Sequence, residues 1–190
     1  MTLTVLAFDQ SPTATGWAIG SPNDQKPRHG VFEMDKWGNN EGDRLVQFHR
    51  WMMDKCQTNE VSDVFYEQPF LPGHGNFHSI EPQFFLIGHI NFVARLLKLP
   101  VRQVAMASWR SRFLGTTKAP PGLKGDAGRQ ELKKMALRAC SKRGWVVWDD
   151  NAAEALGIWD YACSTLDRNH SSNAGIFAGR QESKIWNGER

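Results

Sequence analysis

The first twenty residues constrain the fold more than any other part of the chain. Residues 3–9 read Leu-Thr-Val-Leu-Ala-Phe-Asp, a largely apolar run with an acid at its end. This pattern is typical of a buried strand. Residues 11–15 have the composition of a turn, and residues 16–20, Gly-Trp-Ala-Ile-Gly, then predict a returning strand. The chain therefore opens with a hairpin whose first strand ends at Asp9.

After the hairpin, helix and strand patterns alternate. We expect the following elements: a third strand at 28–34, a helix at 41–57, a strand at 61–67, a loop at 68–77, a helix at 78–97, a strand at 100–104, a short helix at 107–114, a basic loop at 115–125, a helix at 126–143 and a last helix from about Asp149 to Leu166. Three strands followed by this alternation predict an α/β fold with a mixed five-stranded sheet and helices on both faces. We place one domain over residues 1–167 and a loosely ordered C-terminal tail over 168–190.

Composition argues against a membrane or secreted protein. No run approaches the roughly 20 consecutive apolar residues that a membrane span needs, and the first residues lack the basic start of a signal peptide. Three cysteines (Cys56, Cys140 and Cys163) are too few and too scattered for a disulfide framework or a zinc site. We therefore expect a protein of a reducing cytoplasm, with no membrane partner.

The net charge of +3 conceals an uneven distribution. Residues 95–143 carry 13 Lys and Arg against 2 Asp and Glu, whereas residues 1–94 carry a net charge of −5 and residues 144–190 a net charge of −3. A solvated basic face is the usual explanation of a charge run. A net charge of +11 over 49 residues is tolerated more readily when a polyanion neutralises it, which indicates a nucleic acid partner.

Acidic residues recur at the ends of the predicted elements. Asp9 and Glu67 each end a strand. Asp150 and Glu154 lie four residues apart near the start of the last helix, and therefore on one face of it. Such acids can converge at one edge of a sheet, where like charges repel unless a cation neutralises them, and Mg²⁺ or Mn²⁺ suits hard oxygen ligands. Taken singly, each acid has an ordinary explanation, such as Asp149 or Asp150 capping the helix.

Three segments resemble, in order, the motifs of RuvC-type Holliday junction resolvases. They are Phe8-Asp9-Gln10-Ser11 with Gly16-Trp17, then Phe65-Tyr66-Glu67-Gln68-Pro69-Phe70, and then Asp149-Asp150-Asn151-Ala152-Ala153-Glu154-Ala155-Leu156. The second resembles the family's Glu-Gln-x-Phe motif and the third its Asp-Ala-Ala-Asp-Ala-Leu motif. The resemblance spans roughly residues 3–165, and the short, Trp-rich chain looks like phage-encoded members.

This resemblance implies an RNase H-like fold and a homodimer in the cytoplasm of a bacterium or a phage-infected host. It implies two Mg²⁺ ions per active site, which Mn²⁺ would replace, and paired cuts in a four-way DNA junction that leave 5′-phosphate and 3′-hydroxyl ends. Asp9 and Glu67 would be catalytic metal ligands. Glu154 stands where the family has its last Asp, and Asn151 stands at the earlier acid position. The adjacent Asp150 can replace Asn151, so either is a candidate ligand.

Further residues match positions that contact DNA in the family. Phe70 stands at the aromatic position implicated in stacking on junction bases, although a core role is equally open. The basic segment contains Ser108-Trp109-Arg110 and Arg129-Gln130-Glu131-Leu132, placed where the family has DNA-contacting lysines. The expected phosphate contacts or charge stabilisers are Arg110, Lys118, Lys124, Arg129 and Lys133. Four tryptophans among apolar neighbours are expected to pack: Trp51, Trp145, Trp148 and Trp159.

Three other functions remain open at this stage. The segment from Asp9 to Gly16 also resembles the first phosphate loop of actin-like and sugar-kinase ATPases, but those folds need two related domains and roughly twice this length. A non-catalytic protein that binds branched DNA on the same fold is favoured by the Asn151 and Glu154 departures. A related nuclease acting on RNA or on other branched DNA is excluded by no feature of the sequence.

Overall fold

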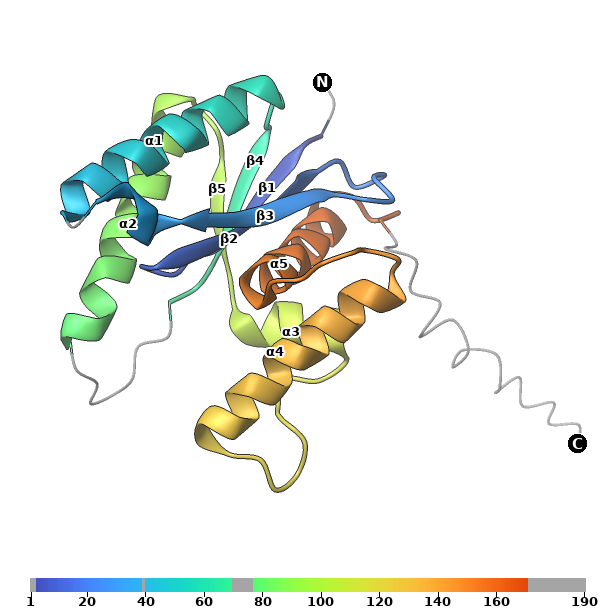
Figure 1. Cartoon of the computed structure of the whole chain (residues 1–190). Helices are drawn as coiled ribbons and strands as arrows, with labels where there is room; N and C mark the ends of the chain where they lie inside the picture. Colours follow the sequence, from blue (N-terminus) through green and yellow to red (C-terminus); the bar gives the residue numbers. More distant parts are fainter. Residues whose placement is uncertain (1–2, 39, 70–76, 171–190) are drawn as a thin grey trace, which may run out of the picture.

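A mixed sheet of five strands forms the centre of the protein (Figure 1). The computed structural model describes residues 3–38, 40–69 and 77–170. In chain order the strands are β1 (Val5–Asp9), β2 (Ala14–Gly20), β3 (Arg28–Glu33), β4 (Asp63–Glu67) and β5 (Val101–Val104). They lie in the order β3-β2-β1-β4-β5, with β1 antiparallel to β2 and parallel to β4. β1 is therefore the central strand, and the predicted mixed α/β sheet is confirmed.

The helices are α1 (Glu41–Thr58), α2 (Phe77–Leu96), α3 (Met106–Leu114), α4 (Gly125–Lys142) and α5 (Asp150–Leu166). They follow the predicted ranges to within two residues. A short 3₁₀ helix, η1 (Met34–Trp37), was not expected from the sequence. None of the helices in the described part of the chain has the length and apolar character to cross a membrane.

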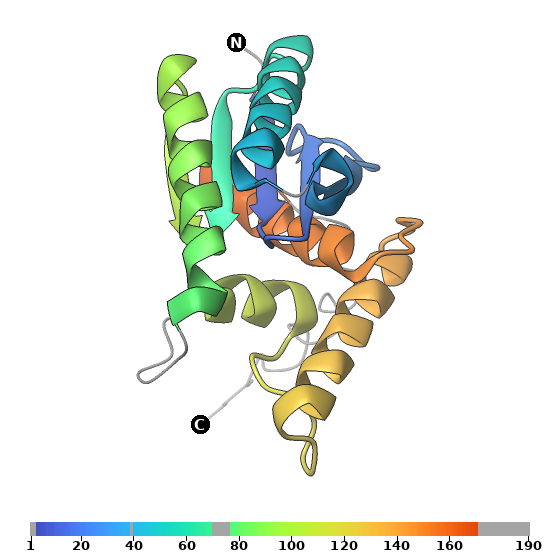
Figure 2. The same cartoon turned by 60° about the vertical axis from the view of Figure 1, so that its left-hand side comes forward.

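Side chains alternate across the sheet and build one core on each face. Val5 and Ala7 of β1 join a core with α3, α4 and α5, whereas Leu6 and Phe8 join a core with α1 and α2. Alternation of this kind is the period of a strand, so a strand buried on both faces needs apolar residues at every position. Figure 2 shows α4 leaning away from the sheet, beyond α3 and α5. The helices on both faces agree with the sequence prediction.

The last described residues pack onto the domain. His170 is buried, and its two ring nitrogens lie 2.6 Å from the Pro22 carbonyl oxygen and 3.1 Å from Asp160 Oδ1. Residues 171–190, most of the predicted loose tail, lie outside the described residues.

Candidate active site

Three carboxylates meet at the edge where β1 and β4 end. Asp9 is the last residue of β1 and Glu67 the last of β4. Because these strands are parallel neighbours, their carboxyl ends lie at the same edge of the sheet. Glu154, buried on the second turn of α5, faces the same edge, and its charge raises the pKa of both Asp9 and Glu67. The strand-end and helix acids therefore lie close enough at this edge to affect one another's charge.

Burial and mutual repulsion both act on these acids. Burial is the main reason that the pKa of Asp9 lies well above its ordinary value, and the charges of Glu154 and Glu67 add to the effect. The pKa values of Glu67 and Glu154 are also raised, again chiefly by burial. The site thus concentrates negative charge in a poorly solvated place, which favours protonation or a bound cation.

A glycine lets α5 approach the sheet closely enough to deliver Glu154. Gly16 of β2 pairs with Asp9 in the antiparallel register. A β-carbon on Gly16 would lie only 2.1 Å from the backbone oxygen of Asn151. Only glycine permits this contact between β2 and the first turn of α5, so Gly16 sets the distance between Asp9 and the helix acids.

Two cations and one indole contact the acids from the helices beyond the sheet. Arg110 of α3 donates to Glu154 over 3.2 Å, and Lys133 of α4 forms an ion pair with Asp150. The indole nitrogen of Trp109 donates to Glu67 Oε1 over 2.8 Å. Arg110 and Lys133 lower the pKa of Asp9 and of Glu154 and so partly offset the repulsion.

The first turn of α5 places its three candidate residues in different surroundings. Asp149 caps the helix, since its side chain accepts from the backbone N–H groups of Asn151 and Ala152. Asp150 is half-buried and lies near enough to raise the pKa of Glu154. The described contacts of Asn151 are those of its backbone, to Asp149 and against Gly16. Asp150 is therefore the better placed of the two candidates to join the three acids.

The donor set fits a divalent cation. Within residues 3–38, 40–69 and 77–170, no group of three or more His, Cys, Asp or Glu side chains is already arranged to hold a metal ion. The acids are held instead by Arg110, Lys133 and Trp109. Even so, these half-buried or buried carboxylates are oxygen ligands in excess of local positive charge, as Mg²⁺ and Mn²⁺ prefer. The buried Gln10 Oε1, next to Asp9 in the chain, also has no hydrogen-bond partner among the described residues.

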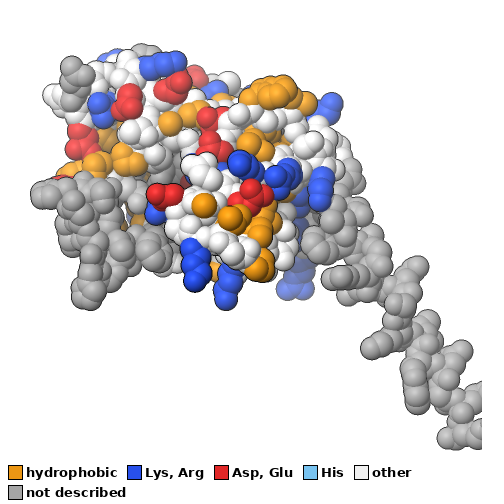
Figure 3. All heavy atoms as spheres, turned by 60° about the horizontal axis from the view of Figure 1, so that its bottom comes forward, with side chains coloured by type: hydrophobic (Ala, Val, Ile, Leu, Met, Phe, Trp, Pro, Cys, Tyr) orange, Lys and Arg blue, Asp and Glu red, His pale blue; other side chains and the backbone are white. Residues whose placement is uncertain are grey.

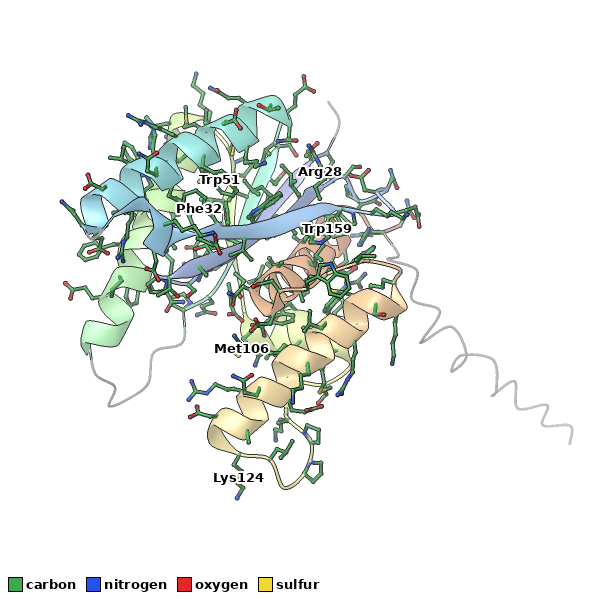
Figure 4. All side chains as sticks on the ribbon, in the orientation of Figure 1. Arg28, Phe32, Trp51, Met106, Lys124 and Trp159 are labelled. Atoms are coloured by element: carbon green, nitrogen blue, oxygen red, sulfur yellow. The ribbon has the colours of Figure 1, made fainter. Side chains whose placement is uncertain are left out.

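The predicted DNA contacts fall into two groups. Arg110 and Lys133 face the acids, and Figure 3 shows basic and acidic side chains next to one another on this end of the molecule. Lys118 and Lys124 are exposed on the α3–α4 connection, and Lys124 lies at its end, beside the start of α4 (Figure 4). Arg129 is exposed on α4, 3.1 Å from Asp126. Phe70 lies outside the described residues.

One of the predicted packing tryptophans is exposed. Trp145 and Trp159 are buried in the core that α3, α4 and α5 form with the sheet. Trp51 packs on Phe32 (Figure 4). Trp148 is 91% exposed, so its predicted packing role is wrong. The neighbouring Val146 is also exposed, and the loop before α5 turns these side chains outward. Apolar neighbours in the sequence do not determine which side of a loop faces the core.

Trp109 is a site residue to which the sequence analysis gave no role. It is fully buried, on the same face of α3 as Phe113 four residues later. That apolar spacing was visible in the sequence, and a buried indole N–H needs an acceptor. Its acceptor is an acid 42 positions away in the chain, so the spacing alone could not identify it.

Comparisons with known proteins bear on the fold. No protein-family model matches the chain, and no curated protein matches it. Among solved structures, Thermus thermophilus RuvC in complex with a Holliday junction substrate is 14% identical with a TM-score of 0.63, covering 86% of this chain and 95% of that one. The yeast mitochondrial Holliday junction resolvase Ydc2 is 12% identical with a TM-score of 0.58, covering 89% and 82%.

A viral structure gives the same result. The Fowlpox virus resolvase in complex with its substrate Holliday junction DNA is 13% identical with a TM-score of 0.52, covering 87% of this chain and all of that one. At these identities the likeness establishes the fold, which is the RNase H-like fold of the RuvC-type resolvases. The resemblance found in the sequence motifs thus extends to the arrangement of the whole described domain.

Proposed function

We propose that this protein is a metal-dependent endonuclease that resolves four-way DNA junctions. The observation that carries the proposal is the convergence of Asp9, Glu67 and Glu154 from two parallel strands and one helix. The fold is shared with three resolvases, two of which were solved with Holliday junction DNA. A fold alone does not specify a reaction, so the proposal depends on the acids as well as on the fold.

Asp9, Glu67 and Glu154 would hold the metal ions, with Asp150 at the outer side of the group. Bound Mg²⁺ or Mn²⁺ would supply an activated water and charge stabilisation for phosphodiester hydrolysis. The protein's own residues prepare this site. Arg110 and Lys133 lower the pKa of Asp9 and Glu154 and so favour the charged carboxylates that ligate metals. The same two cations would also attract the phosphates of a strand bound at the acids.

The basic helices beside the site would bind the DNA backbone. Lys118 and Lys124 project from the α3–α4 connection, and Arg129 follows on α4. Contacts to phosphates supply affinity and salt dependence without sequence preference. This suits a protein that recognises a branched shape.

A homodimer would place two such sites on one junction. The α2 helix exposes Phe84, Phe85, Phe92 and Leu96, and Val46 is exposed on α1, whose His49 contacts Phe92. Apolar side chains gathered on one surface commonly mark an interface between proteins. We propose this face as the dimer contact, because paired cuts need two active sites.

The test is cleavage of a labelled, immobile four-way DNA junction with and without Mg²⁺. The wild type should make paired, ligatable nicks that need the metal. Asp9→Asn should reduce cleavage by more than the roughly 10–100-fold typical of a lost outer-shell partner, because it removes a ligand itself. The matched control is Asp54→Asn, an exposed acid on α1, which should cleave as the wild type does. Junction binding without cutting in any metal would contradict the proposal.

A non-catalytic junction-binding protein is the second candidate. The pairing of Glu154 with Arg110 and of Asp150 with Lys133 favours it, because these acids already have cationic partners. For that protein, Asp9→Asn would leave junction affinity unchanged and Mg²⁺ would have no effect. The same experiment therefore separates the two.

A further inference from the structure

Consecutive residues of α3 contact different acids of the site. Trp109 donates to Glu67 at the end of β4, and Arg110 donates to Glu154 on α5. Successive side chains on a helix point about 100° apart. Trp109 therefore enters the core, whereas Arg110 is largely covered beside it, with the Arg110 guanidinium carbon 5.2 Å from the Trp109 ring centroid.

The Trp109 ring packs against α5 at Gly157, where the helix has no side chain. A β-carbon on Gly157 would lie 2.7 Å from Cε3 of Trp109 and 2.9 Å from Phe113. The indole therefore packs directly on the backbone of α5 at the residue three positions after Glu154. Trp109 is fully buried, so it has little freedom to reorient.

We propose that Trp109 is a positioning residue that fixes the Glu67 carboxylate at a set distance from α5. One side of the indole rests on Gly157, and the nitrogen on its other side holds Glu67 Oε1. The ring thereby acts as a rigid spacer between the β4 acid and the helix that carries Glu154. The hydrogen bond occupies Oε1 of Glu67 and leaves Oε2 for a metal ion. This role of Trp109 rests on the proposed nuclease function.

This arrangement has a chemical reason. The indole N–H of Trp109 donates to Glu67 Oε1 over 2.8 Å. A neutral donor of this kind holds the carboxylate in place without adding a cation that would compete with a metal. Arg110 and Lys133 cannot do this for Glu67 without also repelling the metal.

The first measurement needs no activity. In metal-free protein, the indole N–H resonance of Trp109 is identified as the one missing from Trp109→Phe. It should move on Glu67→Gln more than the other tryptophan indole resonances do, because its acceptor changes from a carboxylate to an amide. An unmoved Trp109 resonance would overturn the proposal, whether or not the wild type is a nuclease.

The second measurement compares two identical substitutions. Trp109→Phe removes the donor and keeps an aromatic ring, and it should lower junction cleavage by about 10–100-fold while metal-free junction affinity stays unchanged. Trp145→Phe also removes a buried indole donor, whose acceptor is the Gln25 carbonyl oxygen, away from the acids. Trp145→Phe should cleave as the wild type does, and its melting temperature should be similar to that of Trp109→Phe. Equal losses in the two variants would show that Trp109 only packs.

A third variant separates packing from positioning. Gly157→Ala should lower both the melting temperature and cleavage, because the new methyl group displaces the Trp109 ring. Adding Trp109→Phe to Gly157→Ala makes room and should restore part of the melting temperature without restoring cleavage. Recovery of cleavage in the double variant would contradict a role for the indole donor.

Discussion

Asp9 is the acid of the site whose charged form is most disfavoured, since its pKa lies well above the ordinary value. It lies at the end of a strand that is buried on both faces, and both Glu67 and Glu154 raise its pKa. Its backbone is fixed by pairing with Gly16 on one side of β1. The folded protein therefore carries the electrostatic cost of a charged Asp9 until Asp9 is protonated or a cation binds.

This cost predicts how the stability of the metal-free protein depends on pH. The ordinary pKa is 3.8 for Asp and 4.5 for Glu, and all three acids titrate above these values in the folded protein. Between the ordinary and the raised pKa values, the folded state holds more protons than the unfolded chain. Raising the pH through that window therefore lowers the free energy of unfolding.

Asp9→Asn should consequently raise the melting temperature at pH 7 in the presence of a chelator. Each unit of pKa shift corresponds to about 1.4 kcal/mol, and for a chain of this size 1 kcal/mol moves the melting temperature by roughly 2–4 °C. The gain should shrink as the pH falls toward the ordinary carboxyl values. Thermal melts from pH 4 to pH 8 check this, with the exposed Asp54→Asn as control. A melting temperature that is lowered equally at every pH would contradict the interpretation.

Among the elements, α5 and its contact with β2 decide whether the acids meet. The helix starts with a cap at Asp149, touches Gly16 through the backbone of Asn151, and presents Glu154 one turn later. Each of these contacts is close and leaves no spare space. The geometry of the site is therefore a property of how α5 docks on the hairpin.

Gly16→Ala should separate the two elements. Its methyl group would overlap the Asn151 carbonyl, and overpacking of this kind costs about 1–3 kcal/mol. We expect a lower melting temperature and a loss of junction cleavage. Gly88→Ala on α2 is the stability control, because a methyl group there meets no described atom within 4 Å, and alanine favours a helix. A Gly16→Ala variant that is as stable and active as the wild type would show that α5 can shift without consequence.

The sequence predicted the acids, but not the contacts between helices and strands that hold them. Asp9, Glu67 and Glu154 were identifiable because strand ends and helix starts are local signals. The partners Arg110, Lys133 and Trp109 were not assigned to particular acids, since those pairs require α3 and α4 to dock on α5 and on the end of β4. Trp148 was misjudged for a similar reason, because burial depends on how its loop leaves α4.

For the whole molecule, the exposed face of α2 and α1 predicts assembly. Phe92 is 55% exposed in the middle of this apolar face. Phe92→Glu should convert the proposed homodimer to a monomer without unfolding it, since the side chain already lies outside the core. Light scattering of the purified protein measures the change. Val146→Glu, at an apolar residue near α5 that is 69% exposed, should remain dimeric. A monomeric wild type would contradict the proposed contact.

The connection between α3 and α4 contributes side chains to neither hydrophobic core. Residues 115–124 are exposed or only partly covered, and Lys118 and Lys124 project from them. Mutations there change the surface offered to DNA at little thermodynamic cost, whereas mutations around Gly16 or Gly157 disturb the helix that carries the acids. For the proposed nuclease, substitutions in this connection would therefore change the preference among branched DNAs and leave the acids in place. For an engineer, this connection is the segment in which to build a library of altered substrate preference.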